Sequence, residues 1–365
     1  MEDHEINDIR NAADFRGFSF SNYKRTEVKT QLLEYLKLRK VEQSCYWTAE
    51  LICSGHFNDI WEIVFHFMSK YIHLANPKLI LYLENRYNIF ANIVNQRHYI
   101  TELDLRNNGK IRLLFAEMIT ILAISVKKTS FELLKINFAE DFNLETMHEK
   151  FKAPSVEYAK AVFRPKDPQE FFIALNEFAF HLSKDSKNIA ECCYWLEWIV
   201  EFDTHCKKKK AKCVADKRNE YAVDTAFKGE IIWIIWDILN LYSSHSPLIE
   251  KLVGGLCNIF CINFTAAATK RRKHILYYAI SIITENINEN LPDMISNKQI
   301  VENVLSKVNN IYKQIKANEI SPNTEYLFDN MQKDNTLNDS IRKLDIMNSA
   351  AAMTTATGGG GGDNP

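Results

Sequence analysis

The sequence predicts an all-α protein, built as an irregular stack of about 11 or 12 antiparallel helices. Apolar residues recur at helical spacing along most of the 365 residues. The chain contains only 11 glycines, and five of them form the run 358–362. The others are too few for a fold made of tight β-turns or of glycine-rich phosphate loops.

Several helix starts are marked by a capping residue followed by proline. The missing N–H of proline costs nothing at the first helical position. These starts are Asn76-Pro77, Asp167-Pro168 and Ser246-Pro247, and further candidate caps are Thr26, Asn58 and Asn297.

Caps and periodicity together predict the order of the helices. Short polar connectors between them favour antiparallel neighbours. The segment 129–138 fits either a strand or a helix. The predicted helices are 26–40, 43–54, 58–75, 77–94, 109–127, 145–162, 168–183, 187–206, 224–242, 247–265, 270–289 and 297–317.

The composition bounds the domain organisation. With 46% apolar residues, the chain can bury a substantial core. We expect a single large helical domain at 24–322, with two related halves at 24–163 and 164–322 as an option. We expect residues 1–23 to be loosely held and the low-complexity residues 323–365 to form a flexible tail.

One triplet occurs twice. Cys45-Tyr46-Trp47 returns 148 positions later as Cys193-Tyr194-Trp195. The match is compatible with a duplicated helix pair or with two core helices. The first copy lies in a helix that is apolar nearly all round, so we expect it in the core. The second lies in an amphipathic helix that ends in lysines, so we expect it at the surface.

Charge is balanced overall and uneven locally. The 45 basic and 46 acidic residues argue against a general attraction to nucleic acid or to a membrane surface. Two runs stand out, a first basic cluster at 207–218 and a second basic cluster at 270–274. They fit solvated helix ends or contacts with phosphate groups. The candidate anion-contacting residues are Lys207, Lys208, Lys209, Lys210, Lys212, Lys270, Arg271, Arg272 and Lys273.

A row of metal-ligand types precedes the first basic cluster. Glu197, Glu201 and His205 are spaced i, i+4 and i+8, so they share one helix face. Carboxylates and an imidazole in such a row are candidate ligands for a divalent metal. The alternative, which we favour, is a solvated stripe on an amphipathic helix.

The sequence contains no motif that predicts catalysis. It has neither a phosphate-binding glycine motif nor the nucleophile motif G-x-S-x-G. Glu50 stands in an otherwise apolar helix, which is a setting for acid–base chemistry, but such a group more often binds an arginine or a backbone amide. We therefore expect a protein that is not an enzyme and that holds no cofactor.

Two further features bear on location. The N-terminal stretch is polar, with no apolar signal region, and the eight cysteines suit buried thiols of an intracellular, cytoplasmic protein. Residues 252–269 carry no charge and are followed by "KRRK", which is compatible with a membrane span. Their asparagines, threonines and glycines favour a buried helix instead, so we expect no membrane partner.

Several segments resemble a conserved helical protein of nucleocytoplasmic large DNA viruses, of the mimivirus and phycodnavirus kind. These segments are "SCYWTAELICSGHFNDIWEI", "HLANPKLILYLENRY", "KIRLLFAEMITILAISVKKTSFE", "CCYWLEWIVEFDTHCKKKKAKC" and "IIWIIWDIL". The resemblance covers about residues 24–290 and brings no catalytic residues. It implies a setting in a virion or a viral factory.

These observations predict a function that rests on protein–protein contacts. We expect a non-enzymatic scaffold or minor structural protein whose partners are other proteins. The alternative is a nucleic-acid-associated protein that uses the two basic clusters.

Overall fold

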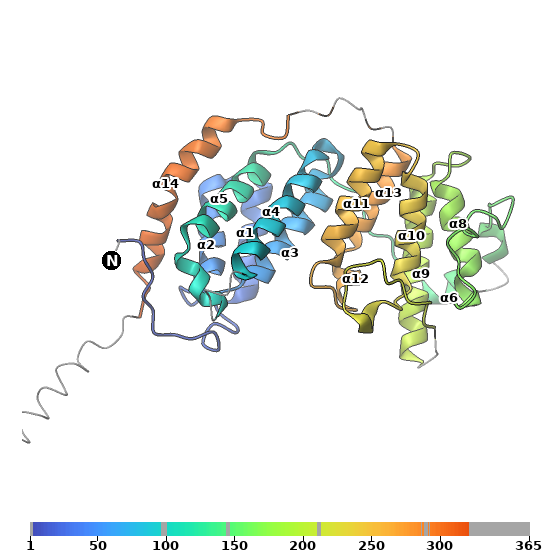
Figure 1. Ribbon diagram of the computed structural model, residues 1–365, viewed down its shortest axis with the longest axis horizontal. Helices are drawn as coiled ribbons and strands as arrows, with labels where there is room; N and C mark the ends of the chain where they lie inside the picture. Colours follow the sequence, from blue (N-terminus) through green and yellow to red (C-terminus); the bar gives the residue numbers. More distant parts are fainter. Residues whose placement is uncertain are drawn as a thin grey trace, which may run out of the picture. The chain divides into compact units, whose positions relative to one another are not determined.

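The computed structural model (Figure 1) confirms the all-α prediction. It describes residues 3–95, 101–143, 147–209, 213–285, 287, 291 and 293–320. These residues contain thirteen α-helices and no β-strand. The helices are α1 (Arg25–Lys37), α2 (Val41–Cys53), α3 (Phe57–Phe67), α4 (Lys78–Asn95), α5 (Gly109–Ile124), α6 (Phe138–Asp141), α8 (Phe172–Leu182), α9 (Ile189–Lys208), α10 (Ile232–Ser243), α11 (Pro247–Cys261), α12 (Ala268–Arg271), α13 (Lys273–Thr284) and α14 (Lys298–Lys316).

By its contacts the chain divides into two units. The first consists of Met1–Ile6 with Asn11–Asn318 and contains all thirteen helices. The second consists of Asn7–Arg10 with Glu319–Pro365. The predicted flexible tail at 323–365 lies outside the described residues, and the division of 24–322 into two related halves stays a prediction.

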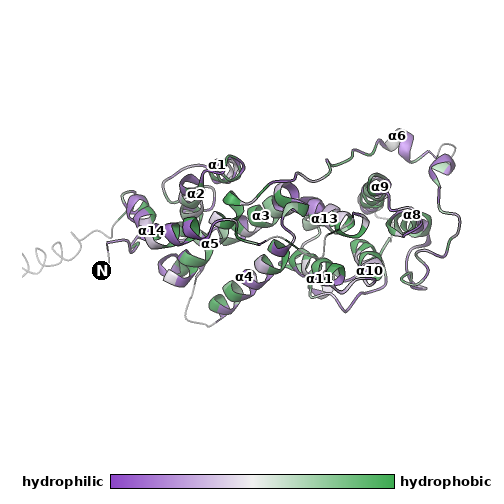
Figure 2. Cartoon of the chain, turned by 90° about the horizontal axis from the view of Figure 1, so that it is seen from above, coloured by the Kyte–Doolittle hydropathy of each residue, from purple (hydrophilic) through white to green (hydrophobic). Residues whose placement is uncertain are grey.

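Helix hairpins form the basis of the first unit. Helix α1 packs on α2, and α8 packs on α9. Helix α13 contacts α9, α10 and α11, and every residue from Lys273 to Thr284 is buried, so α13 is a central helix of the unit. Helix α14 returns from the end of the unit to cover α2 and α5. In Figure 2, α10 and α11 are largely hydrophobic, whereas α14 shows both colours.

The predicted helix at 145–162 is wrong in the part that the structure describes. Residues 148–150 form one 3₁₀ turn, and 151–162 are irregular. Side chains of α8 form hydrogen bonds with the backbone of this segment, in place of the backbone hydrogen bonds of a helix. Asn176 Oδ1 accepts from the Tyr158 N–H at 3.0 Å, and its Nδ2 donates to the Ser155 carbonyl at 2.8 Å. Glu177 accepts from the Lys152 N–H at 2.9 Å.

Three predicted helices are interrupted or shorter than expected. The segment 58–75 is α3 followed by a π-helical turn, Met68–Ile72, and a 3₁₀ turn, His73–Ala75. His73 itself has a positive φ of 49°. The segment 270–289 divides between α12 and α13, and α10 begins at Ile232 rather than at 224. Residues 129–137 are irregular, neither strand nor helix.

The cap predictions are confirmed in part. The Asn297 side chain accepts from the Ile300 N–H at 3.2 Å, and Pro247 occupies the first turn of α11. Asp167 is not a helix cap, because its carboxylate lies in a buried ion pair with Arg218. The residues that precede α1 and α3 are Lys24 and His56, so Thr26 and Asn58 lie inside helices.

Residues before α1 are packed more closely than the sequence suggests. Phe15 and Phe20 are buried in the core. Ser19 donates from its hydroxyl to the Glu50 carboxylate at 2.8 Å, and the Ser21 N–H donates to it at 3.0 Å. The buried carboxylate of Glu50 therefore fixes part of the N-terminal segment to α2.

The first copy of the triplet lies in a largely buried helix, as expected, with Cys45 5% exposed, whereas the surface position expected for the second copy is wrong. Trp195 on α9 is completely buried, whereas Trp47 on α2 is only partly so. Within each triplet the tyrosine and tryptophan rings meet edge to face, with centroids 5.4 Å apart in the first copy and 5.3 Å in the second. Both copies therefore contribute to core packing.

The helix that contains the start of the uncharged stretch 252–269 ends before the stretch does. Helix α11 stops at Cys261, and Asn258 on it is exposed. Among the described residues, no helix combines the length and the apolar character needed to cross a membrane.

Candidate functional site

The first residue of the first basic cluster, Lys207, is paired with two carboxylates. The Lys207 ammonium contacts Asp203 at 2.7 Å and also pairs with Glu230. Burial alone would lower the pKa of Lys207, but these two carboxylates raise it above its usual value. Lys208 and Lys209 are exposed. Lys210 and Lys212 lie outside the described residues.

The far end of the first basic cluster is internal. The Arg218 guanidinium is fully buried and pairs with Asp167 and, at 3.0 Å, with Asp237. Burial alone would raise the pKa of Asp167, but Arg218 and two backbone N–H groups hold it below its usual value. Arg218 is therefore a core ion-pair residue and cannot meet a phosphate at the surface.

The second basic cluster is also half internal. Arg272 is 5% exposed, donates to the carbonyl oxygens of Phe260 and Ile262, and pairs with Glu62 at 2.6 Å. It thereby satisfies carbonyl groups at the end of α11. Lys273 is buried and pairs with Glu197. The exposed members are Lys270, 3.4 Å from Glu201, and Arg271, 3.6 Å from Glu62.

The two clusters meet at one surface hollow of about 410 Å³. Lys207 and Lys208 line it from α9, and Lys270 lines it from α12. Asp203 lines the same hollow, so its charge is mixed rather than uniformly positive. Of the nine candidate anion-contacting residues, the structure thus brings three together and places Arg272 and Lys273 in the interior.

The three candidate metal ligands do not come together as one site. Glu197 is 1% exposed, binds Lys273 and accepts from the Tyr277 hydroxyl at 3.0 Å. Glu201 is directed to Lys270. The described residues contain no group of three histidine, cysteine or acidic side chains arranged to hold a metal ion. The solvated-stripe interpretation is also wrong for Glu197, because the carboxylate lies between α9 and α13.

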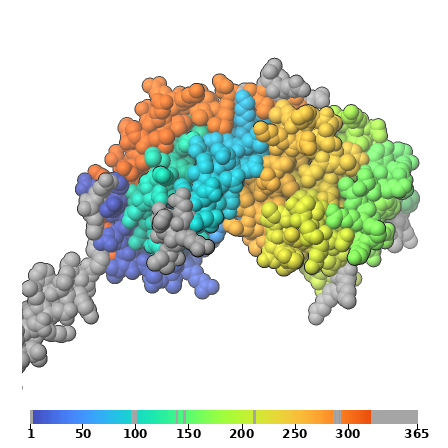
Figure 3. Space-filling view, viewed as in Figure 1, coloured from blue at the N-terminus to red at the C-terminus, as the bar shows by residue number. Residues whose placement is uncertain are grey.

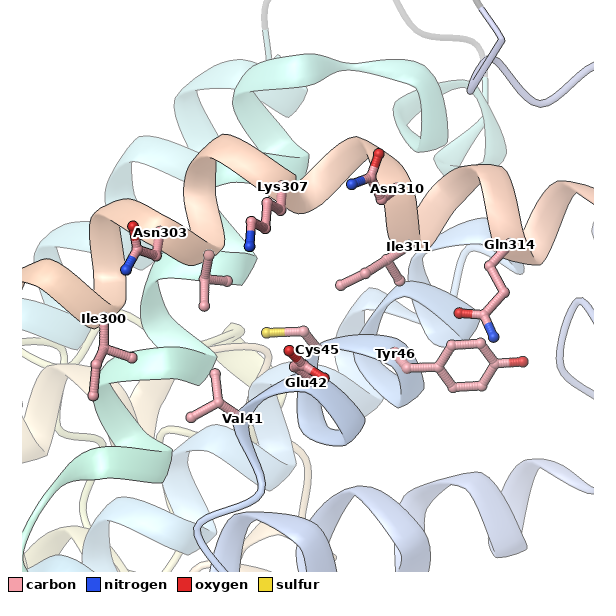
Figure 4. Close-up of a pocket in the computed structure, with 11 residues that line it drawn as sticks. Val41, Glu42, Cys45, Tyr46, Ile300, Asn303, Lys307, Asn310, Ile311 and Gln314 are labelled. Carbon is pink, nitrogen blue, oxygen red and sulfur yellow. The ribbon is translucent and has the colours of Figure 1, made fainter.

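A further groove lies between α2 and α14 (Figure 4). Its volume is about 520 Å³. Val41 and Cys45 line it from α2, and Figure 4 shows Lys307 projecting from α14 toward them. We call this site the helix groove. The remaining lining residues are Glu42, Tyr46, Ile300, Asn303, Val304, Asn310, Ile311 and Gln314.

Helix α14 has a buried apolar face and a second face of mixed apolar and polar residues that lines the helix groove. Val301, Val308, Tyr312 and Ile315 are buried. Ile300, Val304, Lys307, Ile311 and Gln314 line the helix groove at successive spacings of 4, 3, 4 and 3 residues. We call these five residues the open seam. In Figure 3, α14 lies at the surface of its unit, in orange.

The open seam has a signal in the sequence. The spacing of Ile300, Val304 and Ile311 is visible in the sequence as a second apolar row on the helix at 297–317. Which row packs against the core is decided by α2 and α5, and those neighbours are known only from the fold.

The chain was also compared with known proteins. No protein-family model matches it, no curated protein matches it, and no solved structure matches it.

Proposed function

We propose that this protein is a non-enzymatic scaffold whose helix groove receives an amphipathic α-helix of a partner protein. The observation that carries the proposal is the open seam of α14. Its three apolar residues, Ile300, Val304 and Ile311, are spaced by 4 and 7 residues, which places them on one helix face, the kind of face by which one helix packs along another. Ile300 is 37% exposed, so part of this seam faces solvent in the free protein.

The charges along the groove define the partner further. Lys307 and Glu42 are both exposed, and neither has an ion-pair partner among the described residues. They lie on opposite sides of the groove, on α14 and α2. A partner helix with an acidic residue opposite Lys307 and a basic residue opposite Glu42 would be bound in one orientation.

The test is selection of helical peptides from a display library by the purified full-length protein. We expect enriched peptides to carry apolar residues at spacings of 4 and 3, flanked by an acidic residue. Ile300→Asp and Ile311→Asp should weaken binding of the enriched peptides by about tenfold or more. Asn309→Asp adds the same charge to an exposed position of α14 outside the groove and should leave binding unchanged.

The proposal fails if no helical peptide is enriched, or if the groove variants bind the enriched peptides like the unchanged protein. Circular dichroism of each variant separates a lost contact from a lost helix. Lys307→Glu provides a second readout, because it should shift selection from acidic to basic peptides.

The alternative is a protein that binds nucleic acid at the hollow between the two basic clusters. The convergence of Lys207, Lys208 and Lys270 favours it, whereas Asp203, Glu201 and Glu230 oppose it. Binding that weakens steeply with salt and is lost when Lys208 and Lys209 are both replaced by alanine would support this alternative. Salt-independent binding of helical peptides would support the scaffold.

The place of action is also a proposal. The resemblance to proteins of large DNA viruses suggests a virion or a viral factory. Affinity purification from the native source, with capsid and factory proteins scored separately, tests that setting.

A further inference from the structure

Helices α1 and α5 end next to each other at the surface of the first unit. Helix α1 ends at Lys37, α5 ends at Ile124, and the two helices are in contact. The Arg39 guanidinium joins their ends, because it donates to the Ile124 carbonyl at 2.7 Å and to the Ser125 carbonyl at 3.3 Å. The connector after α1 and the segment after α5 are therefore neighbours.

Each of these two segments exposes an aliphatic side chain. Leu38 and Val126 are both 62% exposed. Among the described residues, only one other large apolar side chain, Val214 at 63%, is exposed to that extent. A single exposed apolar residue is ordinary on a protein surface, but two of them on adjacent segments indicate a contact surface.

Cations lie close to these two side chains. The ammonium groups of Lys37 and Lys70 lie 5.0 and 5.4 Å from the centroid of the Tyr71 ring. The Lys127 ammonium lies 5.7 Å from the centroid of the Phe67 ring. The Phe67 and Tyr71 rings are themselves 5.3 Å apart, so they connect the π-helical turn to both segments. We call this surface the basic tip, and it consists of Lys37, Leu38, Arg39, Lys70, Val126 and Lys127.

Most of the positive charge of the basic tip has no carboxylate beside it. Lys37 pairs with Glu34 at 2.8 Å. Within the described residues, Arg39 and Lys127 bind carbonyl oxygens, Lys70 lies over a ring, and none of the three forms an ion pair. Together the carboxyl ends of α1 and α5 offset about one unit of charge, so about two units of positive charge remain. Burial, followed by Arg39, lowers the pKa of Lys127 to about 8, as expected for an ammonium beside another cation.

We propose that the basic tip docks on the surface of a membrane that contains anionic lipids. Leu38 and Val126 enter the interfacial layer, where aliphatic side chains leave water, and the unpaired cations meet the lipid head groups. Such a contact needs no helix that crosses the bilayer, so it differs from the span considered for 252–269. It shares no residue with the helix groove and is independent of the proposed scaffold function.

Two observations favour a membrane over nucleic acid as the occupant. The exposed apolar residues are aliphatic, so they offer no flat ring on which a base could stack. The ring that does lie in this surface, Tyr71, already has the ammonium groups of Lys37 and Lys70 over it. Binding of nucleic acid at the basic tip is therefore an outcome of the test and not the expected one.

Flotation with lipid vesicles tests the proposal on the purified full-length protein. The vesicles contain phosphatidylcholine alone or phosphatidylcholine with phosphatidylserine, and the fraction of protein that floats is measured at low and at physiological ionic strength. We expect binding to the vesicles with phosphatidylserine, weaker binding to phosphatidylcholine alone, and a decline of binding with salt.

Two charge variants and a control locate the contact. Lys70→Ala and Lys127→Ala should each weaken binding to the phosphatidylserine vesicles by about fivefold, the usual contribution of one cation near an anionic surface. Lys184→Ala removes a charge from an exposed position after α8 and should leave binding unchanged. Circular dichroism of each variant shows whether the fold is kept.

An apolar variant provides a readout in the opposite direction. Val126→Trp should strengthen binding to the vesicles, because indole rings favour the membrane interface. Val214→Trp is the matched control, since it adds the same ring at an equally exposed position outside the basic tip, and it should not change binding.

The proposal is overturned if the protein floats with neither kind of vesicle. It is also overturned if Lys127→Ala and Val126→Trp bind the vesicles like the unchanged protein. If the protein binds an oligonucleotide but not the vesicles, and Lys127→Ala removes that binding, the occupant is nucleic acid and the membrane is excluded.

Discussion

Individual buried charges in this protein hold distant segments together. Arg218 is the best example, since it joins the segment after Cys213 to Asp167, before α8, and to Asp237 on α10. Removing one partner of such a pair leaves an uncompensated charge in the interior.

Arg218→Ala should therefore lower the free energy of unfolding by about 3–5 kcal/mol. Arg271→Ala is the control, because Arg271 is 3.6 Å from Glu62 and 53% of its side chain is exposed. Its loss should cost less than about 1 kcal/mol. Urea unfolding of both variants measures the difference, and equal costs would contradict the assignment of Arg218 to the core.

Buried histidines make a second residue-scale contribution. His73 and His274 are 2% and 4% exposed, and neither ring nitrogen of His73 has a hydrogen-bond partner among the described residues. Burial, followed by Lys128, lowers the pKa of His73 to about 4. Burial, followed by His66 and Lys70, lowers the pKa of His274 to about 3.

A lowered histidine pKa means that the unfolded chain binds protons more readily than the folded one. The stability is fully present above the usual histidine pKa of about 6.5 and is lost as pH falls toward the folded value, by up to about 1.4 kcal/mol per pH unit for each histidine. The free energy of unfolding, measured at pH 7, 6, 5 and 4.5, should show this decline. Its slope against pH should be shallower in His274→Phe. His245→Phe, at an exposed position, should keep the original slope.

At the scale of elements, the sequence identified most helices and missed the interactions that break the helical pattern. Repeating apolar positions were sufficient for α2, α9 and α14. They failed for 145–162, because its backbone is bound by Asn176 and Glu177 on α8, and no local pattern shows such distant partners. The helix groove was missed for the same reason, since the open seam is defined by which neighbours α14 has.

The role of Asn176 can be tested at this scale. Asn176→Ala would leave two N–H groups and one carbonyl of residues 155–159 without their partner, at a cost of about 1–3 kcal/mol for each group that stays buried and unpaired. We expect faster hydrogen exchange and earlier proteolytic cleavage in 151–162, with α1 and α2 unaffected. Asn258→Ala, at an exposed position on α11, should change neither.

At the scale of the whole molecule, α14 has two separate tasks. Its buried face covers the core. There the guanidinium carbon of Arg112, on α5, lies 3.8 Å from the centroid of the Tyr312 ring. Its open seam lines the helix groove and is exposed to solvent in part, most clearly at Ile300. The two faces should therefore respond differently to substitution.

Tyr312→Ala should lower the free energy of unfolding by about 3–5 kcal/mol, as for other large buried rings. Ile300→Ala should cost less than about 1 kcal/mol, because the side chain is already 37% exposed. Urea denaturation measures both free energies. For peptide binding we expect the reverse order, with a larger loss of affinity in Ile300→Ala than in Tyr312→Ala. A large loss of stability in Ile300→Ala would contradict an open seam.

The return of α14 to α2 and α5 also has a consequence for synthesis on the ribosome. Helix α5 ends at Ile124 and α14 ends at Lys316, and a ribosome adds about 5–20 residues per second. The apolar surfaces of α2 and α5 therefore stay uncovered for about 10–40 s, until α14 has been synthesised. During that interval the nascent chain presents the same kind of surface that chaperones bind, so its yield in cells should depend on chaperone supply more than the stability of the finished protein would suggest.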